Sequence, residues 1–226
     1  MSDDFVKLRK ALAGKFIVFD GPDGAGKTTT MQAVADQLNG FGTADIVCVR
    51  EPGGTQYGEH IRNILLHTRT NCEGLDETAE MLLFVAARMQ LMNHVVIPAL
   101  KAGKTVFADR FVSSTLAYQG EGLGIDYQKI IDIHKIAIPD EYWPACTLVL
   151  DVCDSVAFDR RCKKNQGSDR IESRSDDFRQ KVRFGYLKQA AIYPEHIKLV
   201  DANSEPEDVC DACILALQKH LLGVGK

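Results

Sequence analysis

The chain has 226 residues, of which 45% are hydrophobic and 26% charged, and its formal net charge is −4. This length fits one ordinary α/β domain, so we expect a single domain over residues 1–226. The negative charge provides no general attraction to DNA, RNA or anionic lipid, so we expect neither nucleic acids nor membranes as partners. Residues 1–5 lack the order of a secretory signal, and no apolar run approaches the roughly 20 residues of a membrane helix. We therefore expect a cytoplasmic protein.

The first predicted strand, Phe16–Phe19, is followed by the segment Gly21–Thr28, which matches G-x-x-x-x-G-K-[ST] at every fixed position. A predicted helix, Lys27–Leu38, begins within it. Glycines in such a loop let backbone N–H groups turn onto phosphates, and the helix N-terminus adds partial positive charge. Lys27 is expected to reach the β- and γ-phosphates, and the Thr28 hydroxyl to ligate Mg²⁺. The predicted ATP-binding residues are Gly21, Pro22, Asp23, Gly24, Ala25, Gly26, Lys27, Thr28 and Thr29.

The second and third predicted strands, Ile46–Val49 and Thr105–Ala108, are each followed by an acidic and a basic residue. Arg50-Glu51 follows the second strand and Asp109-Arg110 follows the third. An arginine at this edge can bind a phosphate through two hydrogen bonds, and Glu51 can support a metal shell. Two arginines facing one phosphate loop indicate a second phosphate group beside the triphosphate. A kinase with a phosphorylated acceptor needs such a site, whereas a GTPase does not.

The rest of the chain continues the alternation of strands and helices. The predicted helices are Asp76–Leu100, Tyr127–Ala137, Asp176–Ala191 and Pro206–Leu221, and the predicted strands are Thr147–Leu150 and Lys198–Val200. The order predicts a P-loop NTPase fold in which a five-stranded parallel sheet has helices on both faces, a three-layer α/β/α arrangement. Ligands of such sheets bind beyond the carboxyl ends of the strands.

Two segments near the end of the chain need separate interpretation. Cys210 and Cys213 form a C-x-x-C sequence, but they lie in the helical pattern Glu207–Leu221, and we interpret them as packing residues of one helix face. The charge-dense segment Asp159–Asp177 is by composition typical of a solvated loop with flanking helix ends. Its cations include Arg160, Arg161, Lys163, Lys164, Arg170 and Arg174.

Taken together, several blocks in one order resemble the thymidylate kinase family across nearly the whole chain. The matching segments are Phe16–Thr29, Arg50–Thr55, Leu83–Arg88, Asp109-Arg110, Ser114-Thr115, Tyr118–Gly120 and Asp169–Glu172. The resemblance implies a transferase that moves the γ-phosphate of ATP to dTMP with Mg²⁺, giving dTDP for dTTP supply. It also implies a homodimer, for which the apolar helix Met81–Leu100 offers surface.

The resemblance assigns roles to individual residues. Phe84 is expected to stack on thymine, and Arg88, one helical turn later, to hydrogen-bond the base edge. Because the exocyclic methyl group is worth only about 1–3 kcal/mol, some activity on dUMP is expected. The residues implied for the acceptor site are Asp23 (to the 3′-hydroxyl), Arg50 and Arg110 (to the phosphate), and Phe84, Arg88, Ser114, Thr115 and Gln119 (around the base).

The family also has a mobile lid, implied here at about residues 160–175. Pro22, Asp23, Gly24 and Ala25 are not basic, so the resemblance is to the bacterial-type branch whose lid supplies the cation for the transferring phosphoryl group. Arg170 is the first candidate, with Arg160, Arg161, Lys163 and Lys164 behind it. The implied catalytic residues are Lys27, Asp109, Arg110 and Arg170, and the implied metal-site residues are Thr28, Asp109 and Glu51.

Two alternatives remain open from the residues alone. The first is a deoxynucleoside kinase or another nucleotide kinase of the same fold, which a comparison of acceptors distinguishes. The second is a regulatory P-loop protein that binds nucleotide without transferring phosphate to a small molecule. Such a protein has no need of a stacking and arginine-lined acceptor pocket.

Overall fold

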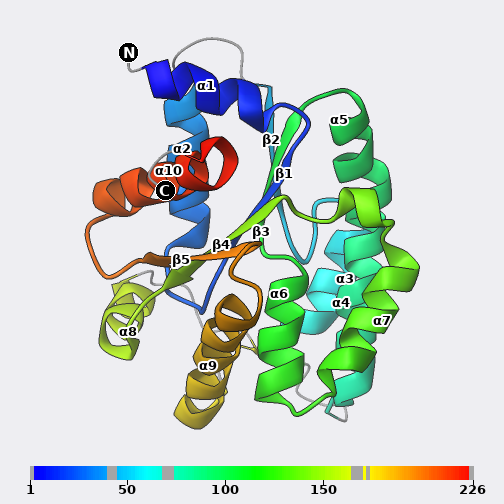
Figure 1. The fold of residues 1–226 in the computed structure, drawn as a ribbon. Coiled ribbons are helices and arrows are strands. Elements are labelled where there is room, and N and C mark those ends of the chain that lie inside the picture. Colours follow the sequence, from blue (N-terminus) through cyan, green and yellow to red (C-terminus); the bar gives the residue numbers. More distant parts are fainter. Residues whose placement is uncertain (1–2, 40–44, 68–73, 164–169, 172–173, 224–226) are drawn as a thin grey trace.

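The computed structural model describes residues 3–39, 45–67, 74–163, 170–171 and 174–223. A parallel five-stranded sheet in the order β2-β3-β1-β4-β5 runs through its centre, with helices on both faces (Figure 1). The three-layer α/β/α prediction is therefore confirmed. The strands are β1 Phe16–Asp20, β2 Ile46–Arg50, β3 Thr105–Asp109, β4 Cys146–Asp151 and β5 Ile197–Asp201.

The predicted helices are present with small shifts at their ends, and further helices lie in segments where none was predicted. The α-helices are α1 Asp3–Leu12, α2 Lys27–Asn39, α3 Gln56–Leu66, α4 Glu77–Leu91, α5 Ile97–Lys101, α6 Val112–Thr115, α7 Tyr127–Ala137, α8 Asp154–Lys163, α9 Asp176–Ile192 and α10 Pro206–Leu222. The sequence analysis missed α1, α3, α6 and α8. Arg160, Arg161 and Lys163 lie in the last turn of α8, which is one of the flanking helix ends expected for the charge-dense segment.

Alternate residues of β1 face two different core layers. Ile17 and Phe19 pack with α1, α2 and α10, whereas Phe16 and Val18 pack with α4, α5 and α7. Figure 1 shows these two groups of helices on opposite sides of the sheet. Because both faces are covered, every residue of β1 is buried, which explains its continuous hydrophobic sequence.

The helix predicted over Asp76–Leu100 has the expected length but is less regular than expected. Asp76 caps α4 by accepting hydrogen bonds from the N–H groups of Thr78 and Ala79, and a π-helical turn, Met92–Val96, joins α4 to α5. The resulting helix, Glu77–Lys101, is long and apolar enough to cross a membrane by those two criteria, which the core helix of a soluble protein also meets. Its residues Met81, Leu91 and Met92 pack in the core against the sheet, as in a central helix.

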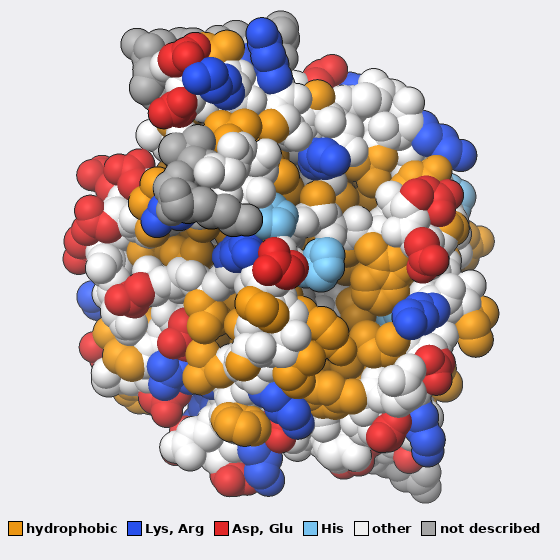
Figure 2. All heavy atoms as spheres, in the orientation of Figure 1, with side chains coloured by type: hydrophobic (Ala, Val, Ile, Leu, Met, Phe, Trp, Pro, Cys, Tyr) orange, Lys and Arg blue, Asp and Glu red, His pale blue; other side chains and the backbone are white. Residues whose placement is uncertain are grey.

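Cys210 and Cys213 are buried on the face of α10 that packs on α2, which confirms their interpretation as packing residues. Burial raises the pKa of Cys213 to about 12, so its thiol is held in the neutral form. On the surface, Figure 2 shows charged side chains of both signs around a group of hydrophobic ones. This mixture fits the small net charge of the chain.

Candidate active site

One cavity of about 870 Å³ lies at the carboxyl ends of β1, β2 and β3 and brings most of the predicted site residues together. It is lined by the phosphate loop from Asp23 onward, by Arg50 and Arg110, and by residues of α4, α6 and the π-helical turn Leu116–Gly122. Gly21 and Pro22 are the predicted residues that do not line it. The strand-end rule therefore identified the right edge of the sheet.

The glycines of the phosphate loop are required by close backbone contacts. Gly21 and Gly24 have φ angles of 138° and 88°. A Cβ atom would lie 2.5 Å from the carbonyl oxygen of Leu150 in the first case and 2.6 Å from that of Ala157 in the second. A side chain at either position would force the loop away from β4 or α8, so the conformation depends on glycine.

Lys27 lies at the start of α2 with only 7% of its surface exposed, and its Nζ donates to the carbonyl oxygen of Pro22 at 2.8 Å. Burial, and next the charge of Arg110, lower its pKa from 10.5 to about 8. Without a bound anion the ammonium group is therefore poorly compensated. A phosphate beside it would supply that compensation.

The Thr28 hydroxyl donates a short hydrogen bond to Asp109 Oδ2, so the P-loop and the end of β3 meet at two predicted metal-site residues. No cluster of three or more His, Cys, Asp or Glu side chains that could hold a metal occurs among the residues described. A hydroxyl and one carboxylate suit Mg²⁺, which takes few protein ligands and completes its shell with water and phosphate oxygens.

Arg110 follows β3 in a left-handed conformation, with φ of 77°. Its Nη2 pairs with Asp23, its Nη1 donates to Ser114 Oγ at 3.0 Å, and its guanidinium lies 5.1 Å from the ring centroid of Tyr118. Burial alone would raise the pKa of Asp23, but Arg110 and then Lys27 lower it below its ordinary value. The arginine and the phosphate loop are thus fixed relative to each other.

Asp20, the last residue of β1, organises this region and was not predicted as a site residue. It is fully buried and accepts hydrogen bonds from the Gly21 N–H at 2.9 Å, Ser114 Oγ at 2.7 Å and the Tyr186 hydroxyl at 2.6 Å. Its position as a charged residue at a strand end was a usable signal. Nothing in the helical sequence around Tyr186 indicated its role.

Arg50 and Phe84 line the same cavity from different sides. Arg50 is exposed at the end of β2 and lies in register with Asp109 of the neighbouring strand, as expected for neighbouring strand ends. Phe84 is half-buried on α4 and packs against the cluster that contains Tyr118 and Tyr186. Its ring is therefore accessible from the cavity but supported from behind.

Arg88 has a complete set of protein partners. Its Nε donates to Glu51 Oε2 at 2.7 Å, its Nη1 to Thr115 Oγ1 at 3.0 Å and to His134 Nε2, and its Nη2 to the Phe111 carbonyl oxygen at 2.9 Å. Glu51, predicted to support the metal, forms an ion pair with this buried guanidinium. The sequence indicated that Arg88 needs a partner but did not identify it.

Gln119 and Arg170, predicted for different functions, meet at one buried carboxylate. Glu80 of α4 accepts from Gln119 Nε2 at 2.8 Å, from Arg170 Nη2 at 2.5 Å and from Arg174 Nη2 at 2.7 Å. Arg170 also donates through Nε to the Leu65 carbonyl oxygen. Arg170 is thus bound to α3 and α4 in this structure, and the sequence analysis missed Glu80.

Arg160 and Arg161, the lid cations of α8 that line the cavity, contact other parts of the chain. Arg161 of α8 donates to the carbonyl oxygen of Asp23 in the phosphate loop at 2.9 Å. Arg160 donates to the carbonyl oxygens of Ala202 and Ser204, both at 2.8 Å. Lys164 and part of the matched segment Asp169–Glu172 lie outside the described residues.

Comparison with known proteins gives consistent results. The model of the family described as Thymidylate kinase matches residues 19–213. The chain is 41% identical to a thymidylate kinase of Exiguobacterium sibiricum over 213 residues, 92% of this chain and 98% of the relative, and 42% identical to one of Enterococcus faecalis over 208 residues, 91% and 96% of the two chains. The crystal structure of thymidylate kinase from Ehrlichia chaffeensis has a TM-score of 0.71 and 31% identity, and the match covers 91% of this chain and 99% of that one.

Proposed function

Because this chain belongs to the thymidylate kinase family, it is an enzyme that uses ATP to phosphorylate dTMP to dTDP, and we propose that it does so in the cavity at the carboxyl edge of the sheet. The main support for this location is that the P-loop and two arginines at strand ends, Arg50 and Arg110, line the same cavity. Membership of this family favours dTMP kinase activity over the two alternatives left open by the sequence, a nucleoside or other nucleotide kinase and a regulatory P-loop protein.

The acceptor occupies the part of the cavity between α4 and the end of β3. Arg50 and Arg110 bind its monophosphate, because guanidinium groups match the geometry of phosphate oxygens. Phe84 supports the base by stacking. Asp23, which forms an ion pair with Arg110, accepts a hydrogen bond from the 3′-hydroxyl of the deoxyribose. The acceptor oxygen is thereby held close to the γ-phosphate of the donor, which is the main contribution a kinase makes.

The donor phosphates lie in the loop Gly21–Thr28. Lys27 stabilises the negative charge that spreads over the γ-phosphate oxygens in the transition state. Burial removes water from its ammonium group, and the phosphates of ATP replace that water with negative charge. Thr28 and Asp109 would hold Mg²⁺, which would neutralise phosphate charge when bound. The N–H groups of the loop and the start of α2 complete the binding of the phosphates.

The cation for the transferring phosphoryl group comes from the lid at about residues 160–175. Arg161 is the candidate that already touches the phosphate loop, through the carbonyl oxygen of Asp23. Arg170, the first candidate from the sequence, has to leave Glu80 to reach a γ-phosphate. Closure of the lid excludes water, which would otherwise accept the phosphoryl group.

The active enzyme is a cytoplasmic homodimer in this proposal. Large hydrophobic side chains are exposed on the paired helices α3 and α4, with 68% of Tyr57, 52% of Ile64 and 47% of Leu82 accessible. A partner that covers this surface would remove it from water at a gain of about 25 cal/mol per Å² of apolar area. Light scattering at concentrations used for the assay tests the oligomeric state.

An acceptor comparison tests the proposed function. ADP release with ATP and Mg²⁺ is measured with dTMP, dUMP, dCMP, dGMP, dAMP and thymidine at equal concentrations. We expect dTMP to be the best acceptor, dUMP a poorer one, and thymidine inactive, because thymidine offers no phosphate to Arg50 and Arg110. Turnover of thymidine at a rate similar to dTMP would show that the two arginines do not form a phosphate site.

A further inference from the structure

His134 of α7 is buried behind Arg88, on the side away from the acceptor. Its exposed fraction is 0%, and it is absent from the residues that line the cavity, whereas Arg88, Glu51 and Thr115 all line it. Its Nε2 contacts Arg88 Nη1 directly. His134 therefore contacts the Arg88 guanidinium from behind, whereas the side chains of Glu51 and Thr115 contact it from the cavity.

The tautomer of His134 follows from its two contacts. Nδ1 lies 2.7 Å from the carbonyl oxygen of Ile130, one turn earlier in α7, and only a protonated Nδ1 can form that hydrogen bond. In the neutral ring Nε2 then carries the lone pair and accepts from Arg88. Burial, and next the positive charge of Arg88, lower the pKa of His134 to about 3, which keeps the ring neutral in the range where the enzyme is assayed.

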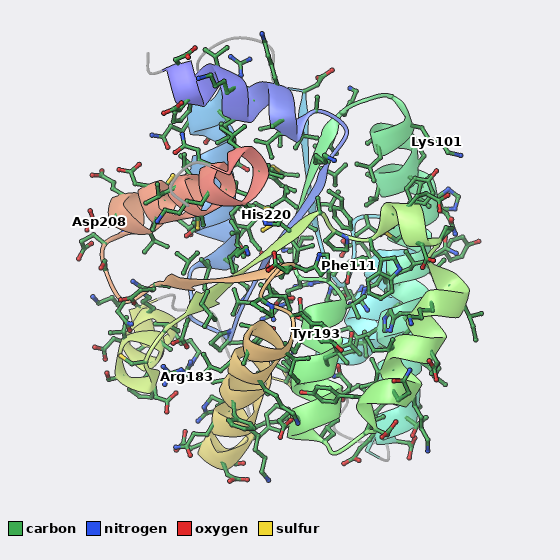
Figure 3. The ribbon with its side chains drawn as sticks, viewed as in Figure 1. Lys101, Phe111, Arg183, Tyr193, Asp208 and His220 are labelled. Atoms are coloured by element: carbon green, nitrogen blue, oxygen red, sulfur yellow. The ribbon has the colours of Figure 1, made fainter. Side chains whose placement is uncertain are left out.

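The contact with His134 has a geometric consequence for Arg88. A guanidinium is planar, so acceptors placed around its edge fix both its position and the direction of its plane. Glu51 holds the Nε side, the Phe111 carbonyl oxygen holds Nη2, and Thr115 and His134 hold Nη1. In Figure 3, Phe111 lies between the sheet and the helices on the side of α7, and its ring centroid lies 5.1 Å from the Arg88 guanidinium carbon.

We propose that His134 is a positioning residue for base recognition, because its neutral ring, anchored on the carbonyl oxygen of Ile130, sets the orientation of the Arg88 guanidinium toward the acceptor site. This inference rests on the proposed function and on the role at the base edge that the family resemblance implies for Arg88. His134 itself does not contact the acceptor. Thr115, which lines the cavity, is the partner of Nη1 that a base can replace, while His134 keeps its own contact with Nη1 behind the cavity. Thymine presents a carbonyl oxygen where cytosine presents an amino group, so an N–H released from Thr115 and held in place by the His134 contact favours dTMP over dCMP.

The experiment compares His134→Gln, which keeps an acceptor close to the place of Nε2, with His134→Leu, which has similar size and no acceptor. Equilibrium dissociation constants for dTMP and dCMP are measured by calorimetry, together with kcat and the KM values for ATP and dTMP. We expect His134→Leu to weaken dTMP binding about tenfold, since it removes a hydrogen bond to a charged group, and to reduce the preference over dCMP. The KM for ATP and the kcat at saturating dTMP are expected to be retained, and His134→Gln is expected to restore most of the loss.

Two further variants separate this role from a structural one and from the role of Arg88. Ile138→Val removes a methylene from the same core layer, at the end of α7, without removing a side-chain acceptor, and it is expected to lower the Tm but not to change dTMP affinity. Arg88→Met is expected to lose dTMP affinity and selectivity by itself. In that background His134→Leu should have no additional effect, because the group it orients is gone.

The outcomes are distinct. Unchanged dTMP affinity in Arg88→Met overturns the proposed role of Arg88, and with it this inference. A loss in Arg88→Met with no loss in His134→Leu overturns the role of His134 alone. If His134→Leu lowers dTMP affinity by the same factor in the unmodified enzyme and in Arg88→Met, the loss does not act through Arg88, and His134 belongs to the general packing of the core. A parallel rise in the KM for ATP would lead to the same assignment.

Discussion

Arg110 forms an ion pair with Asp23, which joins the end of β3 to the phosphate loop before any substrate is bound. The pair connects residues 87 positions apart in the chain. The left-handed backbone of Arg110 directs its side chain back across the strand ends, where Ser114 and Tyr118 also contact it. The proposed acceptor-phosphate site is therefore preorganised, which reduces the cost of ordering it when dTMP binds.

Replacement of Arg110 by lysine tests the need for a planar group at this position. Arg110→Lys keeps the positive charge beside Asp23 but cannot form two parallel hydrogen bonds to a phosphate. We expect kcat/KM for dTMP to fall between about ten- and a hundredfold, the effect of losing a hydrogen bond to a charged group. Calorimetry with thymidine is the control, since thymidine has no phosphate and its affinity should change little. An equal loss for thymidine would indicate a distorted pocket instead.

The identity of the lid cation is tested by matched substitutions in Arg161 and Arg170. Arg161→Met is expected to lower kcat about a hundredfold or more, as removal of a charged group from a transition-state site does, with a smaller effect on the KM for dTMP. Arg170→Met removes a partner of Glu80, and we expect its main effect on thermal stability and on the KM for dTMP. Single-turnover measurements with saturating ATP and dTMP separate these effects. The reverse pattern would assign the phosphoryl cation to Arg170.

The metal site is tested by the dependence of the rate on Mg²⁺ concentration. Asp109→Asn replaces the carboxylate that Thr28 contacts with a neutral amide, which is a weaker ligand for Mg²⁺. We expect the Mg²⁺ concentration for half-maximal rate to rise about tenfold or more. Glu51→Gln is the matched acidic-to-amide variant: because Glu51 pairs with Arg88, it should raise the KM for dTMP and leave the Mg²⁺ requirement unchanged. A shifted Mg²⁺ requirement in Glu51→Gln would support the metal role inferred for it from the sequence.

Lys27 predicts a pH dependence of ATP binding. Its pKa of about 8 in the free enzyme means that the ammonium form is lost as the pH rises through that value, so ATP affinity should decrease about thirtyfold between pH 7 and pH 9.5. Stability has the opposite slope. Because the folded pKa lies below the ordinary value of 10.5, the unfolded chain binds more protons between these two values, and this group makes the free enzyme more stable as pH rises from about 8 to 10.5.

Calorimetric titrations of ATP across this range provide the measurement, with Lys27→Arg as the control that keeps its charge at every pH tested. An ATP affinity that stays constant to pH 9.5 in the unmodified enzyme would contradict the lowered pKa of Lys27.

The sequence by itself determined the features that depend on short spacing. The strands from Phe16, Ile46 and Thr105 are continuous hydrophobic runs, and the loop Gly21–Thr28 has fixed positions for its glycines, lysine and threonine, so both could be recognised locally. Charged residues directly after strands identified the edge where the cavity lies. Of the helices that were missed, α6 has only four residues and α8 is largely polar, so tertiary packing stabilises them more than local preference does. By contrast, α1 and α3 have amphipathic patterns that the sequence analysis could have used.

Only the tertiary structure decided which side chains meet. Arg88 is 37 positions from Glu51 and 46 from His134, and Arg170 is 90 from Glu80. Such pairs depend on how the crossover helices pack on the sheet, and one charged residue in a helical pattern gives no indication of its partner. The physical reason is that a buried charge must be compensated, but many folds of the same pattern would satisfy that requirement with different groups.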